Sequence, residues 1–249
     1  MVERQEHDFT GRELRRLYLH GADMRGGAIY DARLRGVDLW DIDIRGDMQN
    51  VRVNGVDIAP LVEAELNRRD PDRAKMRPAD ADGFREAWRI LETRWAATVE
   101  RASSLPEQRL HEPVDDEWSF IQTLRHLCFA TDAWVARMVL GHTSPWHPLD
   151  LPWDEAPGWE GIPWDRDAQP PLGEVLALRS DRQGLVRGVL ADLTDEQLKS
   201  TVTRTEPGWP QVQDISIERC LRIVVKEEWQ HRDFAERDLS RLVDDRDFR

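Results

Sequence analysis

The chain has 249 residues, of which 40% are hydrophobic and 33% charged, and its formal net charge is −13. This is the composition of a globular protein with a strongly polar surface, and the acidic balance argues against nucleic acid or an anionic membrane as a partner, because phosphate groups bind Lys and Arg. The sequence holds no apolar run of about 20 residues and no hydrophobic signal core at its start, so we expect a cytoplasmic protein.

The first fifty residues carry an apolar side chain at every fifth position. The series consists of Phe9, Leu14, Leu19, Met24, Ile29, Leu34, Leu39 and Ile44. A period of five fits neither a helix nor a strand. The units "GADMR", "DARLR", "GVDLW" and "DIDIR" resemble the pentapeptide-repeat family, and this resemblance implies a short right-handed β-solenoid over residues 1–55. Because about two coils are few for a solenoid, we expect the segment to depend on the rest of the protein for its stability. Its expected role is packing or interaction.

Residues 56–79 read as a linking helix and a loop. The Asn54-Gly55 dipeptide supplies a turn, Val56–Arg69 has a helical pattern, and a breaker-rich stretch follows. In residues 80–249, apolar side chains recur at spacings of three and four in the segments 82–104, 117–140, 173–192 and 216–241. Four such segments without strand signals predict a mainly α protein whose larger domain is a four-helix bundle.

A long crossover separates the second and third predicted helices. Residues 143–171 hold seven prolines and four of the chain's tryptophans, Trp146, Trp153, Trp159 and Trp164. A loop of this length is usually functional or disordered, and four large apolar rings are unusual in a disordered linker. We expect these rings to pack the loop against the bundle, with a role as a substrate lid as the alternative.

One histidine and a late group of charges point to a divalent metal. His126 lies close to the apolar stripe of the second helix, while Glu227 and His231 are four residues apart on the fourth, so both project from one face. Glu228, three residues before His231, is an alternative carboxylate. Two imidazoles and one carboxylate form an open three-ligand site suited to zinc, iron, nickel or another first-row ion. The alternative is a solvated helix face with His126 in the core.

The stretch "DEWSFIQTLRHL" over residues 116–127, followed by "EEWQHRDFAERDL" over residues 227–239, resembles the DinB/YfiT-like superfamily. The likeness covers roughly residues 80–242 and implies a DinB-like four-helix bundle. In that family a histidine of the second helix and an H-x-x-x-H pair of the last helix bind a divalent metal. His126 and His231 match two of these positions, whereas the third is Glu227 here, which leaves the metal's identity open.

The resemblance also implies a function. Several relatives of actinobacterial type, and others from bacilli, are transferases or isomerases that use a low-molecular-weight thiol such as mycothiol. We therefore expect a small-molecule substrate and an external thiol, since Cys128 and Cys220 lie within helical patterns and read as buried free thiols. His142 and His147, after the second helix, are candidates for proton transfer or substrate contact.

Two other functions stay open. A metal-dependent hydrolase would need a base beside the metal-bound water, for which Glu228 is the candidate. A non-catalytic binding module, in which the repeat segment recruits a partner, would explain the replacement of a family histidine by Glu227. The sequence also leaves a homodimer open.

Overall fold

A computed structural model describes residues 8–15, 17–22, 24, 28–46, 48–115, 117–159, 161–206 and 208–244. Residues 1–7 of the predicted repeat segment and residues 245–249 of the predicted bundle therefore lie outside the described residues. Contacts divide the chain into two compact units, Met1–Met48 and Gln49–Arg249. Each unit is described by itself below.

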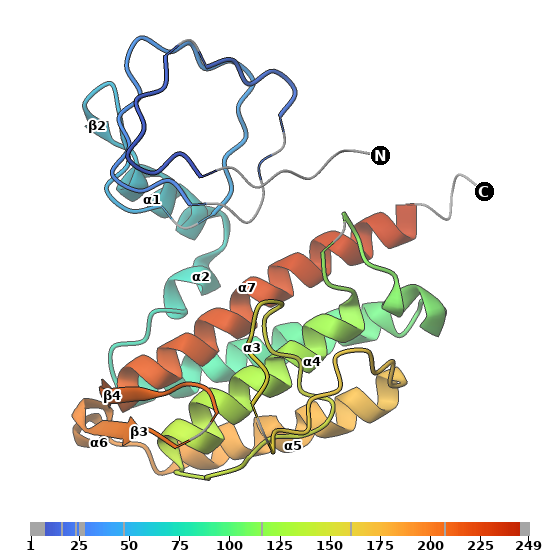
Figure 1. Ribbon diagram of the computed structural model, residues 1–249. Helices are drawn as coiled ribbons and strands as arrows, with labels where there is room; N and C mark the ends of the chain where they lie inside the picture. The colour runs from blue at the N-terminus through green and yellow to red at the C-terminus, as the bar shows by residue number, and fades with distance from the viewer. Residues whose placement is uncertain are drawn as a thin grey trace. The chain divides into compact units, whose positions relative to one another are not determined.

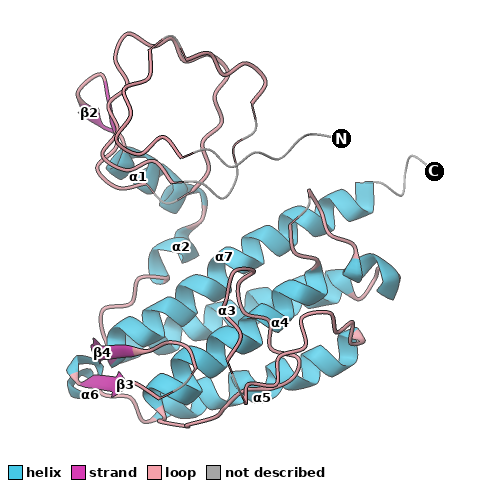
Figure 2. Ribbon diagram, viewed as in Figure 1, coloured by secondary structure: helices cyan, strands magenta, loops and turns pink. Residues whose placement is uncertain are grey.

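The described residues of the first unit contain no helix or strand, and the trace winds through loops (Figures 1 and 2). Its backbone nevertheless repeats with the period of the sequence. Positive φ angles occur in a single phase of that period, at Gly11, Gly21, Asp31, Gly36, Asp41 and Gly46. Glycine and aspartate are among the residues that tolerate this conformation best. The apolar residues of the repeat are exposed, from Leu14 at 46% to Ile29 at 74%, so the β-solenoid stays a prediction.

The second unit begins with a small hairpin. Strand β1 (Arg52–Val53) pairs antiparallel with β2 (Val56–Asp57), and both residues of the predicted Asn54-Gly55 turn have positive φ angles. This is the backbone that a two-residue hairpin requires. The linking helix α1 (Ala59–Arg69) and the short helix α2 (Pro71–Lys75) follow, and the Asp70 side chain caps α2.

Four long helical segments form the predicted bundle. They are α3 (Ala81–Ala102), α4 (Phe120–Thr131) with its continuation η2 (Asp132–Val139), α5 (Leu172–Ala191) and α7 (Ile217–Asp244). Helix α4 packs on α5 and α7, and α3 packs on the same two helices (Figure 1). The mainly helical fold is thus confirmed, with boundaries within a few residues of the prediction.

The described residues form three apolar core clusters, of which two lie chiefly among the bundle helices and the third joins them to the crossover loop. Of the two in the bundle, one lies around Phe84, Trp88 and Leu221, and the other around Phe120, Leu124 and Leu239. Burying several large apolar side chains of this kind contributes about 1.5–3 kcal/mol for each residue. Among the helices of the described ranges, none combines the length and the apolar character that a membrane span requires.

Several smaller elements were not predicted. The continuation η2 is a π-helix, a rarer geometry that apolar spacing does not distinguish from an α-helix. A 3-10 turn, η1 (Glu107–His111), precedes α4, and helix α6 (Asp195–Lys199) follows α5. An antiparallel hairpin of β3 (Thr201–Arg204) and β4 (Val212–Ser216) then leads into α7. Its strands are four and five residues long, too short for a clear alternating pattern.

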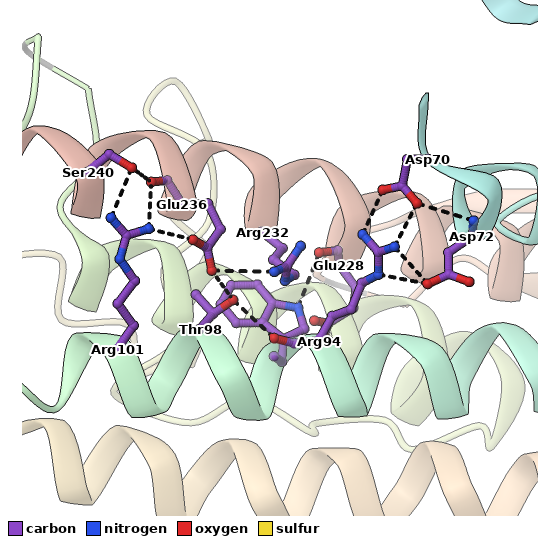
Figure 3. A network of polar contacts seen from close by, with 10 residues as sticks. Asp70, Asp72, Arg94, Thr98, Arg101, Glu228, Arg232, Glu236 and Ser240 are labelled. Carbon is purple, nitrogen blue, oxygen red and sulfur yellow. Dashed lines mark hydrogen bonds and ion pairs between the residues drawn. The ribbon is translucent and has the colours of Figure 1, made fainter. Parts of the chain in front are cut away.

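A polar network joins α3, α7 and the linker (Figure 3). Arg94 of α3 donates to both oxygens of Asp70, with N···O distances of 2.6 and 2.7 Å, and also to Asp72. Further along, Glu236 of α7 accepts hydrogen bonds from Thr98 and Arg101. Bidentate Arg–carboxylate pairs are strong and directional, so the linker is tied to the bundle by more than chain connectivity.

Candidate metal centre

Helix α4 holds His126 two turns after a well-defined start. The Ser119 hydroxyl accepts from the Gln122 backbone N–H, and the Gln122 side chain accepts from the Ser119 N–H, which is a capping box. The His126 residue is 8% exposed, and its Nδ1 lies 2.9 Å from the carbonyl oxygen of Leu151. A carbonyl only accepts, so Nδ1 carries a proton and Nε2 is directed toward α7.

Helix α7 places the two other predicted ligands opposite that nitrogen. The Glu227 Oε2 atom lies 3.1 Å from His231 Nε2 and 3.4 Å from His126 Nε2. One ligand atom from each of the three residues lies within 4.8 Å of the others. The i, i+4 spacing on α7 and the α4–α7 packing together bring the predicted group His126, Glu227 and His231 to one point.

These separations suit a divalent cation. Two ligand atoms about 2.1 Å from a tetrahedral ion are about 3.4 Å apart, close to both measured distances. The Glu227 side chain is 30% exposed, so an ion can reach the group from solvent. Two imidazoles and a carboxylate are also the donor set of an open, catalytic type of site. The residues present therefore fit a divalent metal.

The electrostatics favour a positive charge at the same point. Burial raises the pKa of Glu227, but the hydrogen bonds from His126 and His231 outweigh it and hold the pKa far below its usual range. Because Nδ1 of His126 holds a proton toward Leu151, Nε2 donates to the carboxylate only when the ring carries a second proton, and otherwise Nε2 and the carboxylate oxygen are both acceptors. Two acceptors that face one another at 3.4 Å need a proton or a cation between them.

Aromatic side chains surround the imidazoles. The Trp118 ring stacks on His231, with centroids 5.9 Å apart, and lies 4.6 Å from the His126 ring. Phe129 flanks His126 and Phe234 flanks His231. The Trp118 Nε1–H also donates to Asp154 of the crossover loop at 3.0 Å. An apolar surround reduces solvent screening and so strengthens charge interactions at the site.

The crossover loop is fastened beside this site. Arg125 is fully buried and donates to four carbonyl oxygens of the loop, those of Leu149, Asp165, Arg166 and Ala168. Trp146 and Trp164 pack on Phe129, and Trp159 packs on Trp164. Packing of the loop tryptophans against the bundle is confirmed, while the lid role stays a prediction.

The position of Glu228 corrects one prediction. Its side chain is 1% exposed and accepts from both terminal nitrogens of Arg179, at 2.9 and 3.2 Å, instead of joining the histidines. Consecutive residues of a helix project about 100° apart, so Glu227 and Glu228 of α7 cannot share one partner. Glu227 is therefore the carboxylate of the group, and Glu228 is not placed to act as a base there.

The two loop histidines lie outside the three-residue group. The His142 backbone N–H bonds to the Ala136 carbonyl at the end of η2. The His147 Nδ1 accepts from the Leu149 N–H, and burial, followed by the charge of Arg182, lowers the pKa of His147. Their roles in proton transfer or substrate contact stay predictions.

Sequence reasoning missed the residues that orient the ligands. The Leu151 carbonyl and the Arg125 guanidinium act through backbone contacts 24 or more positions away in the chain, and no local pattern reports such contacts. Trp118 belongs to the quoted W-S motif, but only its contacts with both rings reveal its position over the site.

Comparison with known families supplies the remaining evidence. The family model described as the DinB superfamily matches residues 90–235, more than half of the chain. Comparisons with curated proteins and with solved structures found no match. The matched range contains His126, Glu227 and His231. The chain belongs to the DinB superfamily.

Proposed function

We propose that this protein is a metal-dependent enzyme that uses a low-molecular-weight thiol in a transfer or isomerisation reaction. The observation that carries the proposal is the meeting of one atom each from His126, Glu227 and His231 within 4.8 Å. A divalent cation held there would lower the pKa of a thiol and keep it as the thiolate at neutral pH.

The charge of the ligand set supports a monoanionic partner. The two imidazoles bind a metal in their neutral form, and Glu227 contributes one negative charge. With a divalent cation the set would carry one net positive charge among Trp118, Phe129 and Phe234. One thiolate neutralises that charge, which is the reason to prefer a thiol to a neutral ligand.

The chain's own cysteines favour a thiol from outside. Cys128 and Cys220 are both free and buried, as the sequence predicts. Burial raises the pKa of Cys220 to about 11 and that of Cys128 higher still. Buried thiols with raised pKa values are poor nucleophiles, so the reactive sulfur would belong to a small molecule.

The hydrolase alternative loses its candidate base. Glu228 was the carboxylate expected beside a metal-bound water, and both of its oxygens are engaged by Arg179 in the bundle interior. The alternative of a non-catalytic binding module differs from the proposal in requiring no bound metal, which makes metal content the first measurement.

The first experiment compares wild type with His126→Ala, His231→Ala and the control His111→Ala, by elemental analysis and by titration with Zn²⁺. His111 lies on η1, outside the ligand group. We expect stoichiometric metal in wild type and in the control, and its loss in the other two variants. Equal metal in all four proteins, or none in wild type after loading, would contradict the metal site.

The second experiment tests the thiol. Co²⁺-loaded protein is titrated with small thiols of different size while its absorption is recorded, since sulfur ligation produces a charge-transfer band. We expect this band in wild type and in His111→Ala, and turnover of an electrophilic test substrate only with the thiol present. Bound metal without a band for any thiol, and turnover with water alone, would favour the hydrolase.

A further inference from the structure

A second buried acidic site lies where the crossover loop meets the bundle. Asp132 is the first residue of η2 and is 1% exposed, while Asp150 of the loop is fully buried. The two carboxyl groups are close enough for each to affect the pKa of the other. Two carboxyl groups so far from water need an explanation, because burial disfavours their charged form.

Each carboxyl group has one satisfied oxygen. The Asp132 Oδ2 atom accepts from Arg182 Nε at 3.1 Å and from its Nη2 at 2.8 Å. The Asp150 Oδ2 atom accepts from the backbone N–H of His147 at 2.9 Å. The Oδ1 atoms of both aspartates are buried and have no hydrogen-bond partner in the part of the chain that the structure describes. Both are acceptors when ionised, so only a proton can turn their contact into a hydrogen bond.

The charges around the two aspartates favour a proton on one of them. The titratable and charged groups that face the two aspartates from α4, α5 and the loop are Arg125, Cys128, His147, Asp181 and Arg182. Arg125 is directed to loop carbonyls, and the lowered pKa of His147 keeps its ring neutral. Among the described residues, Arg182 is then the cation paired with the two carboxyl groups, and it contacts Asp132.

We propose that Asp132 and Asp150 share one proton at neutral pH, carried by Asp150 Oδ1 and donated to Asp132 Oδ1. The carboxylate of Asp132 then balances Arg182, and neither Oδ1 atom remains unpaired. Burial, followed by the charge of Asp132, raises the pKa of Asp150 well above its ordinary value. Burial also raises the pKa of Asp132, against the effect of Arg182.

The shared proton holds the loop in place at Asp150, the residue before Leu151. The Leu151 carbonyl accepts from Nδ1 of His126, so the same turn of the loop that holds the proton also orients this imidazole. The inference goes beyond the proposed function and does not rest on it, because the two aspartates and Arg182 keep their contacts whether or not a metal or a thiol binds.

The direction of the pH dependence follows from the raised pKa. The folded protein binds the proton more tightly than the unfolded chain, whose aspartates titrate near about 3.9. The stabilisation is therefore complete below that pH and is lost as the pH rises through the pKa of the pair in the folded protein. Within this window each pH unit lowers the folding equilibrium constant by up to about tenfold.

The test uses Asp150→Asn, because an amide can accept from the His147 N–H and donate to Asp132 Oδ1 at every pH. Infrared spectra of protein with carbon-13 in its aspartate carboxyl groups should show the C=O stretch of a protonated acid in wild type at pH 7. This band should be lost in Asp150→Asn and kept in the control Glu155→Gln, which lies on an exposed part of the same loop.

The folding equilibrium supplies a second readout. The ratio of the wild-type folding constant to that of Asp150→Asn should fall as the pH rises above about 4, by up to about tenfold per unit, and then level off. A wild-type spectrum without the band at pH 7, or a ratio independent of pH, overturns the proposal. If Asp150→Asn fails to fold, Asp132→Asn takes its place in the spectra, since loss of either partner removes or shifts the band.

Discussion

Two neighbouring carboxylates of α7 meet very different partners. Glu228 is buried against Arg179, a cation that is part of the chain and always charged, with both oxygens bonded. Glu227 faces two imidazoles and is 30% exposed, so its positive partner can be a proton or an ion from solvent. Glu228 of α7 thus forms a permanent charge pair that serves stability. Glu227, one residue away, has a positive partner that can be exchanged, which suits a function.

The largest effect is expected from Glu228→Ala. This change leaves the Arg179 guanidinium buried and unpaired, which we expect to lower the free energy of unfolding by about 3–5 kcal/mol. Urea denaturation measures the loss. The double variant Arg179→Met with Glu228→Leu should recover most of it, because an apolar pair of similar volume needs no charge compensation. A loss below about 1 kcal/mol in the single variant would show that the pair is not desolvated.

Glu227→Ala, in contrast, should affect metal affinity more than stability. The free energy of unfolding of the metal-free protein should fall by less than in Glu228→Ala, since the Glu227 carboxylate is partly solvated. Affinity for Zn²⁺, measured by competition with a chromophoric chelator, should fall on the order of 100-fold or more, because outer-shell changes alone cost 10–100-fold. A stability loss equal to that of Glu228→Ala with unchanged affinity would remove the distinction between the two carboxylates.

The smallest effect is expected at Asp70, which tests whether the geometry of an ion pair or its burial decides how much it contributes to stability. Arg94 and Asp70 form a bidentate pair like that of Arg179 and Glu228, but the Asp70 side chain is 34% exposed. Hydrogen bonding from Arg94 lowers the pKa of Asp70 despite partial burial. Its stabilisation is therefore present above the ordinary aspartate pKa and is lost as the pH falls through the lower folded value.

Asp70→Asn should accordingly cost about 1 kcal/mol at pH 7 and nothing below the folded pKa, as judged by urea denaturation between pH 2 and 7. Asp80→Asn, at the exposed cap of α3, is the matched control, because its side chain accepts from the Gly83 N–H and, among the described residues, forms no bidentate pair with an arginine. A constant difference between wild type and Asp70→Asn over this range would mean that the charge of Asp70 is not involved.

Local patterns were sufficient for the helices but not for every contact. The apolar spacings predicted all four long helices, and the Asn54-Gly55 dipeptide predicted a turn, because both signals depend on residues a few positions apart. The hairpin that this turn closes was not predicted. The π geometry of η2 and the short β3–β4 hairpin were missed, since neither leaves a distinct local signal. In the first unit the five-residue period appears in the backbone angles, but the solenoid is not shown.

The sequence by itself determined that His126, Glu227 and His231 could meet. Helical periodicity places Glu227 and His231 on one face of α7, and the order of the helices allows a histidine of α4 to oppose them. It could not determine which glutamate joins them or which groups orient the rings. Those choices depend on the rotation of α7 against α4 and α5 and on where the crossover loop lies. Side chains and carbonyls far apart in the chain decide both together, as the contacts of Arg179 with Glu228 and of Leu151 with His126 illustrate.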